Sequence, residues 1–314
     1  GLYSAVAREG LTRVVMCCQH EASLARWMPR SYEIEWEPIK TNDRFRRLAF
    51  ELPRIQKSVK PDFAQFNYIC PLQKTGPWVN VIHDLLFLEE KQYFPLSYRI
   101  KNAALFRMSA LRSDRLMTVS EYSRRAIHRH FDIPLDRIQV VPAAPDAFVD
   151  APAEPVPGLA EGRFAVYVSR FEPRKNQHAL VNAFCDMLDG LDPDQTLVLV
   201  GSPALAYPEL DAALERAGDR VRCLSNISRD QLTWVYRNAC ASIYPSRAEG
   251  FGMPIIEAVA AGGISYCADN TAMSELVPHV HGSFDANDPD QIKATLERAV
   301  TNEARGRSEA VRES

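Results

Sequence analysis

Short apolar runs alternate with longer stretches of helical periodicity along most of the chain. Runs of the first kind are typical of buried parallel strands, and in the first part of the chain they cover residues 13–18, 63–66, 79–83, 116–120 and 138–141. Helical spacing falls between them at residues 44–59, 98–112 and 121–131. This alternation predicts a doubly wound α/β domain with a parallel sheet.

A proline-rich stretch then interrupts the pattern, with Pro145, Pro152, Pro155 and Pro157 in short succession. Proline interrupts both helices and strands, so the stretch is interpreted as a domain linker. The alternation then restarts, with strands expected at 164–169, 196–201, 221–224, 241–245 and 264–267 and helices near 176–189, 208–217, 229–239 and 254–261. The pattern therefore predicts an N-terminal domain at 1–150, a linker at 151–162 and a C-terminal domain at 163–314.

The two ends of the chain carry weaker patterns. Residues 1–9 have the spacing of a helix that leads into the first apolar run, so we expect the N-terminal domain to lack its first strand. Residues 301–314 have no apolar periodicity of the kind that docks a helix.

The length of 314 residues is consistent with two domains, since it exceeds the usual size of one core. With 46% hydrophobic residues, 25% charged residues and a net charge of −3, the composition is that of an ordinary globular protein and argues against wrapping a nucleic acid. The seven cysteines have no zinc-type spacing and are interpreted as free thiols. No leader or long apolar span is seen, so a cytoplasmic protein is predicted.

The segment from Pro245 to Glu257 is the most informative part of the sequence. It follows an apolar strand and runs into a helix, where Gly250 and Gly252 allow a ligand to approach the backbone. The exposed N–H groups of a helix N-terminus attract phosphate, and the carboxylates of Glu249 and Glu257 accept hydrogen bonds from sugar or ribose hydroxyls. The segment therefore predicts an anion-binding corner at the carboxyl end of a strand.

This segment resembles the signature of retaining glycosyltransferases of the GT-B fold, in particular glycosyltransferase family 4, whose two glutamates are separated by seven residues. Further segments carry the same resemblance along the chain, at 81–84, 119–123 and 168–176. The resemblance implies two Rossmann-like doubly wound domains that face a central cleft. It also implies that Glu249 contacts hydroxyls of the donor sugar, that Glu257 contacts the ribose, and that the backbone of Gly250, Phe251 and Gly252 contacts the donor.

Arg170 and Lys175 follow the first strand of the C-terminal domain and are predicted to stabilise the charge of a departing diphosphate. Arg174, between them, is interpreted as a solvated surface charge. His83 follows a strand of the N-terminal domain, and the resemblance places it near the donor sugar and the acceptor, although a lone histidine is also compatible with a structural role. Asp84 is expected to orient the loop.

Two aspartate pairs have the DxD pattern of metal-dependent sugar transfer, Asp192 with Asp194 and Asp288 with Asp290. Their settings favour a turn for the first pair and helix capping for the second. We therefore predict no metal. Ser120 precedes a helix and is interpreted as its N-cap, and capping is also an alternative role for Asn270.

The function predicted is retaining transfer of a sugar from a nucleotide-sugar donor to a hydroxyl of a glycan or lipid-linked acceptor, with Arg170, Lys175, Glu249 and His83 as catalytic residues. The donor is a substrate, no cofactor is expected, and GDP-mannose is preferred over UDP- and dTDP-sugars on the resemblance alone. Peripheral association with the inner face of the membrane stays open. The alternatives are a nucleotide-sugar enzyme of another reaction type, such as an epimerase, and a nucleotide-sugar-binding or assembly subunit with impaired turnover.

Overall fold

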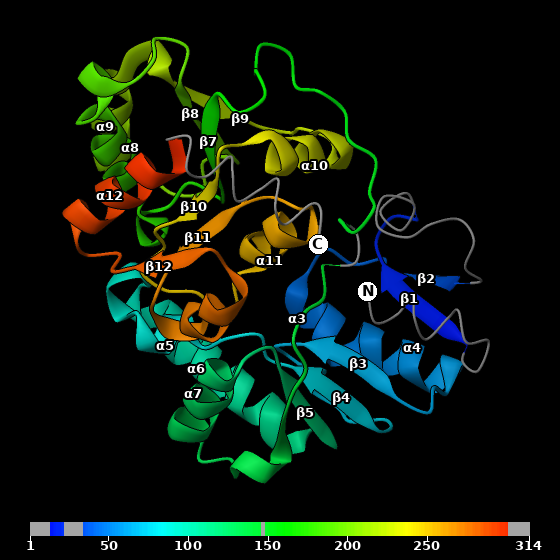
Figure 1. The fold of residues 1–314 in the computed structure, drawn as a ribbon. Helices are drawn as coiled ribbons and strands as arrows, with labels where there is room; N and C mark the ends of the chain where they lie inside the picture. Colours follow the sequence, from blue (N-terminus) through cyan, green and yellow to red (C-terminus); the bar gives the residue numbers. More distant parts are fainter. Residues whose placement is uncertain (1–12, 22–33, 146–147, 301–314) are drawn as a thin grey trace. The chain divides into compact units, whose positions relative to one another are not determined.

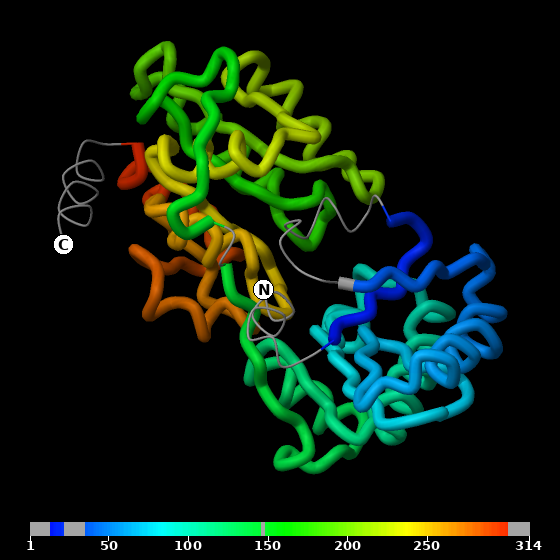
Figure 2. Tube along the Cα trace, turned by 90° about the vertical axis from the view of Figure 1, so that its right-hand side faces the viewer, coloured from blue at the N-terminus to red at the C-terminus, as the bar shows by residue number. Residues whose placement is uncertain are grey.

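The computed structural model describes residues 13–21, 34–145 and 148–300, and these divide between two compact units, Gly1–Pro142 and Ala143–Ser314. Each unit is formed by one continuous stretch of sequence, which can be followed by colour along the trace (Figure 2). The expected helix at 1–9 and the expected unpatterned end at 301–314 lie outside the described residues.

The first unit contains two parallel sheets (Figure 1). One pairs β1 (Val14–Cys18) with β2 (Ile34–Pro38), and the other has the order β3-β4-β5-β6. The strands of the second sheet are β3 (Ala64–Asn67), β4 (Trp78–Val81), β5 (Arg115–Thr118) and β6 (Ile138–Val140). The connections from β4 to β5 and from β5 to β6 both contain helices, and both move across the sheet in the same direction. Because such crossovers are right-handed, the helices of both connections lie on one face of the sheet.

The helical segments of the first unit include one irregular element. A π-helical turn, η1 (Arg47–Glu51), joins the short α3 (Arg44–Arg46) to α4 (Leu52–Val59). The others are α5 (Leu86–Glu89), η2 (Lys91–Tyr93), α6 (Leu96–Arg112), α7 (Glu121–Phe131) and η3 (Leu135–Arg137). The core between sheet and helices includes Ile82, Leu116 and Phe131, all of them buried.

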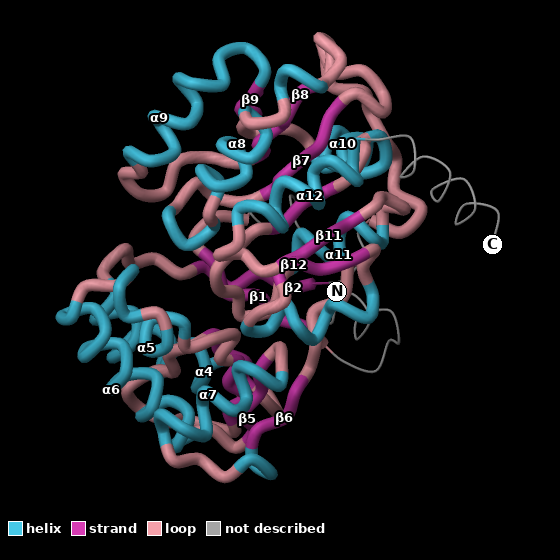
Figure 3. Tube along the Cα trace, turned by 60° about the vertical axis from the view of Figure 1, so that its left-hand side comes forward, coloured by secondary structure: helices cyan, strands magenta, loops and turns pink. Residues whose placement is uncertain are grey.

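The described residues of the second unit form one parallel sheet with the strand order β12-β11-β10-β7-β8-β9. The strands of this sheet are drawn in magenta in Figure 3. Its strands are β7 (Phe164–Val168), β8 (Thr196–Val200), β9 (Val221–Leu224), β10 (Ser242–Tyr244), β11 (Ser265–Ala268) and β12 (Gly282–Phe284). Its α-helices are α8 (Gln177–Cys185), α9 (Pro208–Ala217), α10 (Arg229–Asn238), α11 (Met253–Ala260) and α12 (Pro289–Val300). Its 3₁₀ helices are η4 (Pro173–Lys175), η5 (Leu188–Gly190), η6 (Gly218–Arg220) and η7 (Thr271–His279).

The chain of the second unit moves outward in one direction from β7 to β9, then returns to β10 beside β7 and moves outward the other way. β7 and β10 are therefore the two strands at which the winding direction changes. In open parallel sheets this switch point is where ligands bind, just beyond the carboxyl ends of the strands.

The stretch at 151–162 differs from the predicted linker. Val156 is buried among Phe164, Val166 and other residues of the second unit, and the backbone N–H of Glu154 donates to the carbonyl of Asp230 at 3.0 Å. Proline does interrupt helix and strand here, but the stretch still buries an apolar side chain and so packs as part of the second unit.

Candidate functional site

Two loops of the second unit meet at its switch point. The first follows β7 and contains η4, and the second follows β10 and leads into α11. The strands themselves are neighbours, with Ser242 in register with Val166. The sheet order therefore brings together two segments that are more than seventy residues apart in the sequence.

The two loops are joined beneath the surface. The buried Tyr167 hydroxyl donates to the carbonyl of Lys175 at 2.9 Å and lies 2.7 Å from the hydroxyl of Ser246. The backbone N–H of Arg247 donates to the carbonyl of Arg174 at 2.9 Å. Because Tyr167 stands on β7 itself, the sheet fixes the relative position of both loops.

Glu249 is the centre of an ion-pair cluster between these loops. Lys175 Nζ lies 2.5 Å from Oε1 of Glu249, and a guanidinium nitrogen of Arg174 lies 3.3 Å from Oε2. Arg174 also donates to the carbonyl of Ala248 and pairs with the carboxylate of Glu172. The side chains of Lys175, Arg174 and Glu249 are only 13–15% exposed, so the cluster is largely shielded from water.

The cations hold Glu249 in its ionised form. Burial by itself raises the pKa of the Glu249 carboxyl, but Lys175 and Arg174 outweigh burial, and the pKa lies below its ordinary value. The structure thus holds a carboxylate and an ammonium in contact at the switch point, which suits a ligand that carries hydroxyls beside negative charge.

A third loop fixes the backbone of Glu249. The N–H of Glu249 donates to the hydroxyl of Thr271 at 3.0 Å, and Thr271 adopts a left-handed backbone with φ of 46°. Asn270 makes no capping hydrogen bond with its side chain and instead donates to the carbonyl of Ser246 at 3.0 Å. The alternative capping role of the Asn270 side chain is therefore wrong, and this loop supports the site.

The turn from Gly250 to Gly252 has the geometry that a glycine requires. Gly252 has φ of 107°, and a Cβ there would lie 2.8 Å from a side-chain carbon of Ile255. Gly250 is buried, and Phe251 packs on the core of the unit. The turn delivers the chain to the N-terminus of α11, as the sequence predicts.

Glu257, on α11, has a different environment from Glu249. The hydroxyl of the buried Tyr236 donates to Oε2 of Glu257 at 3.1 Å. Burial raises the pKa of the Glu257 carboxyl above its ordinary value, although Tyr236 and Arg229 act in the opposite direction. The pKa values of the two glutamates are therefore shifted in opposite directions, downward for Glu249 and upward for Glu257.

The two remaining site residues lie in separate settings. Arg170 is exposed after β7, and no ion pair of its guanidinium occurs among the described residues. His83 belongs to the first unit, just after β4, with its ring centroid 5.2 Å from that of Tyr68. Burial lowers the pKa of His83 while Asp84 opposes the shift, so the imidazole is neutral at physiological pH.

The DxD patterns and Ser120 have structural partners. Asp192 and Asp194 both pair with Arg163, and Asp288 accepts from the backbone N–H groups of Asp290 and Gln291 at the start of α12. The hydroxyl of Ser120 accepts from the N–H of Ser123, so the predicted N-cap is confirmed.

Comparison with known proteins bears on both units. The family described as Glycosyl transferases group 1 matches residues 155–313, and the one described as Glycosyltransferase Family 4 matches residues 2–147. The chain belongs to glycosyltransferase family 4. An O-antigen chain mannosyltransferase B of Escherichia coli is 30% identical over 237 residues, which is 72% of this chain and 62% of the relative. The family 4 chain thus spans about three-fifths of that relative's length.

Two solved structures show that this family 4 chain has the GT-B fold. A sucrose-phosphate synthase of Thermosynechococcus elongatus matches with a TM-score of 0.71 and 18% identity, covering 98% of this chain and 88% of that one. WaaG, a glycosyltransferase involved in lipopolysaccharide biosynthesis, matches with a TM-score of 0.70 and 16% identity, covering 97% and 86%.

Sequence reasoning about this family 4 member was wrong on Arg174. We interpreted Arg174 as a solvated surface charge, but its side chain is 13% exposed and contacts Ala248 and two glutamates. Of these partners, Ala248 and Glu249 lie on the loop after β10, so spacing within the 168–176 segment gives no signal for them. Tyr167, Tyr236 and Thr271 were missed for the same reason.

Proposed function

We propose that the chain is a retaining glycosyltransferase that moves a sugar from a nucleotide-sugar donor to a hydroxyl of a glycan or lipid-linked acceptor. The observation that carries this proposal is the contact between Lys175 and Glu249 at the switch point of the second unit. A cation and a carboxylate side by side suit the two adjoining parts of such a donor, its diphosphate and its sugar.

Each residue then has a distinct part in donor binding. Lys175 and the exposed Arg170 take the diphosphate, while Glu249 accepts hydrogen bonds from sugar hydroxyls and Glu257 from the ribose. The backbone from Gly250 to Gly252 lies along the donor. Arg174 keeps Glu249 in place, since it bonds both its carboxylate and the carbonyl before it.

The reaction breaks the bond between the anomeric carbon and the diphosphate oxygen and forms a bond to the acceptor oxygen on the same face. The acceptor proton passes to a phosphate oxygen of the leaving diphosphate. Negative charge grows on that diphosphate, and preorganised cations stabilise it, so the proposal requires no metal. The neutral imidazole of His83 orients the acceptor hydroxyl or the donor sugar.

A mannosyl donor is supported by the relatives, since several of those that match this chain are named as mannosyltransferases, and we propose that this donor is GDP-mannose. Thermal shift with GDP, UDP and dTDP tests the base: the preferred diphosphate stabilises the native state by mass action, by about 2.7 kcal/mol at a hundred times its Kd. We expect GDP to give the largest shift.

Transfer of labelled mannose from GDP-mannose to a glycan then separates the alternatives. Transfer with retained anomeric configuration, undiminished by a chelator, supports the proposal. Conversion of the donor to an epimer, or tight binding with neither transfer nor hydrolysis, would instead favour the other two functions.

We also propose that the protein works at the cytoplasmic face of a membrane. Across the continuous helical segment 44–59, Arg46, Phe50, Arg54 and Lys57 are exposed at intervals of four, four and three, so they share one face. None of these three cations forms an ion pair within the described ranges. A cationic face with an exposed aromatic ring suits anionic lipid headgroups. In the described residues, no helix combines the length and the apolarity needed to cross a bilayer.

Sedimentation with vesicles tests this surface. We expect the protein to bind phosphatidylglycerol vesicles, and to bind phosphatidylcholine vesicles more weakly. High salt should weaken the binding, and replacing Arg46, Arg54 and Lys57 by glutamine should remove most of it. The matched control replaces the exposed Lys101 and Arg107 of α6. Equal loss in both sets would show a general charge effect and contradict a docking face.

A further inference from the structure

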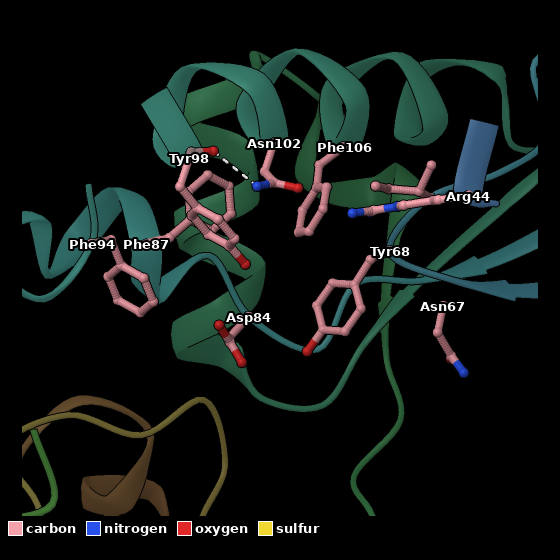
Figure 4. A pocket seen from close by; sticks show the side chains of 10 residues that line it. Arg44, Asn67, Tyr68, Asp84, Phe87, Phe94, Tyr98, Asn102 and Phe106 are labelled. Carbon is pink, nitrogen blue, oxygen red and sulfur yellow. Dashed lines mark hydrogen bonds between the residues drawn. The ribbon is translucent and has the colours of Figure 1, made fainter. Parts of the chain in front are cut away.

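The first unit contains a cavity of about 330 Å³ that the donor site does not use (Figure 4). Asn67, the last residue of β3, lines it together with Tyr68 and Ile69 just after the strand, and Asp84 lines it just beyond β4. The cavity therefore lies at the carboxyl ends of two neighbouring parallel strands, the position at which such sheets bind ligands. Ligand pockets span roughly 300–1,000 Å³, so this one suits a single sugar ring better than a nucleotide sugar.

Aromatic rings form a continuous series along this pocket. The centroids of Tyr68 and Phe106 are 5.1 Å apart, those of Phe106 and Phe87 5.2 Å, and those of Phe87 and Tyr98 6.0 Å. Phe94 stacks on Tyr98 at 6.0 Å. Ring faces of this kind pack against the apolar C–H face of a pyranose.

The series also ends beside His83 of the same unit. The ring of Tyr68 lies 5.2 Å from His83 at its other side. A sugar held against these rings is therefore one ring away from the imidazole that we assign to the acceptor or the donor sugar. Tyr68 adopts a left-handed backbone with φ of 64°, which turns the chain at the end of β3.

Polar groups enter the pocket from different sides. Asp84 and the hydroxyl of Tyr68 approach one another at the lower edge in Figure 4, and burial together with Asp84 raises the pKa of the Tyr68 phenol. The carboxamide of the buried Asn102 is held by its donation to the carbonyl of Tyr98 at 2.8 Å. Carboxylate, phenol and carboxamide together can accept and donate hydrogen bonds to sugar hydroxyls.

Arg44 contributes a positive charge to the pocket. Its exposed guanidinium reaches toward Phe106 from α3 (Figure 4), on a different side from Asp84, and forms no ion pair within the described part of the chain. A guanidinium presents paired N–H donors that match phosphate oxygens.

We propose that this pocket binds one sugar ring of the acceptor and that Arg44 binds a phosphate carried on that sugar. The inference rests on the proposed function and deepens it, because it makes the acceptor a phosphate-bearing saccharide such as one linked to a lipid through phosphate. The rings and Asp84 recognise the sugar, and Arg44 recognises the phosphate.

Calorimetry on the full chain tests the pocket with two probes, methyl α-mannoside and mannose 1-phosphate. We expect the phosphorylated sugar to bind about tenfold more tightly, the size of one charge-assisted contact. Arg44→Met should remove that advantage and leave binding of the neutral sugar unchanged. Tyr98→Ala, at a side chain that is 47% exposed, should weaken both probes about fivefold without unfolding the chain.

Matched controls come from the same segment. Arg46→Met and Phe45→Ala alter an exposed cation and an exposed ring that do not line the pocket, and should change neither affinity. Equal losses from Arg44→Met and Arg46→Met, or unchanged binding in Tyr98→Ala, would overturn the proposal.

Two further measurements separate this pocket from the donor site. Lys175→Met should leave mannose 1-phosphate binding intact, and loss there instead would assign the binding to the donor site and overturn the inference. Hydrolysis of the donor without acceptor reports the donor site alone. If hydrolysis persists while neither probe binds, the pocket assignment fails and the proposed function stands; if the chain neither binds nor uses any donor, the proposed function fails.

Discussion

At the scale of single residues, the two glutamates of the signature have opposite electrostatics. Glu249 contacts Lys175 and Arg174, which lower its pKa, whereas Glu257 is buried beside a tyrosine and has a raised pKa. Removing one partner of a shielded ion pair leaves charge uncompensated. Removing the Glu257 carboxylate leaves no such partner, because its hydrogen bond comes from the neutral Tyr236 and Arg229 acts on it without an ion pair among the described residues.

Gln substitutions should therefore separate the two positions. We expect Glu249→Gln to lower the free energy of unfolding by about 3 kcal/mol at pH 7, because it leaves Lys175 and Arg174 without their shared carboxylate. Glu257→Gln should change it by less than about 1 kcal/mol. Chemical denaturation measures both, and a larger loss in Glu257→Gln would contradict this electrostatic account.

The dependence on pH follows from the same shifts. The stabilisation from Glu249 is present above its unfolded-state pKa, near 4.5, and is lost as pH falls through the lower folded-state value. The contribution of Glu257 to stability has the opposite pH dependence, because its folded-state pKa is raised. It is present below the unfolded-state pKa and is lost as pH rises through the folded-state pKa. Chemical denaturation at several pH values between 3 and 7 measures the free energy of unfolding of the wild type and of each Gln variant. In each variant we expect the pH dependence that comes from the replaced glutamate to be absent.

At the scale of elements, the loop after β7 depends on its neighbour β8. Gly201 follows β8, and a Cβ there would lie 1.9 Å from the carbonyl oxygen of Ser169, at the start of that loop. Gly201→Ala must push the loop away, so we expect a loss of about 1–3 kcal/mol in stability and weaker binding of nucleoside diphosphate.

Gly190→Ala is the matched control, since nothing lies within 4 Å of a Cβ at Gly190. Thermal shift with and without nucleoside diphosphate compares the two variants. Equal behaviour of both would mean that the contact between Gly201 and Ser169 does not shape the site.

Element positions follow closely from periodicity. The apolar runs predict ten strands, and the structure has each of them within one or two residues, as for β7 and β9. β2 and β12 were missed: the 34–38 stretch alternates acidic residues with apolar ones, and 282–284 is only three residues long. Neither makes a recognisable buried run.

Contacts between elements follow from the sequence only once the strand order is known. The positions of Lys175 and Glu249 at strand ends can be predicted from the pattern, but their contact depends on β7 and β10 being neighbours. The same holds for Arg174, whose charge alone suggests a surface role. Tyr167 looks like an ordinary core residue, and only its hydroxyl contacts with Lys175 and Ser246 reveal its role.

At the scale of the whole molecule, we propose that the second unit provides donor chemistry and the first recognises the acceptor. The family 4 membership and the GT-B fold are consistent with this division. The cations after β7 then stabilise the leaving diphosphate, and catalysis depends on them.

The rate of sugar transfer at saturating donor, per folded protein, tests that claim most directly in Arg170→Ala, Lys175→Ala and the double variant. We expect each single variant to lose about 10²–10³-fold and the double variant to lose less than the product, because both cations act on one diphosphate. Arg170→Ala should keep its melting temperature, since Arg170 is exposed, whereas Lys175→Ala loses the pair with Glu249. Wild-type transfer rates in the folded fraction of both single variants would contradict the account.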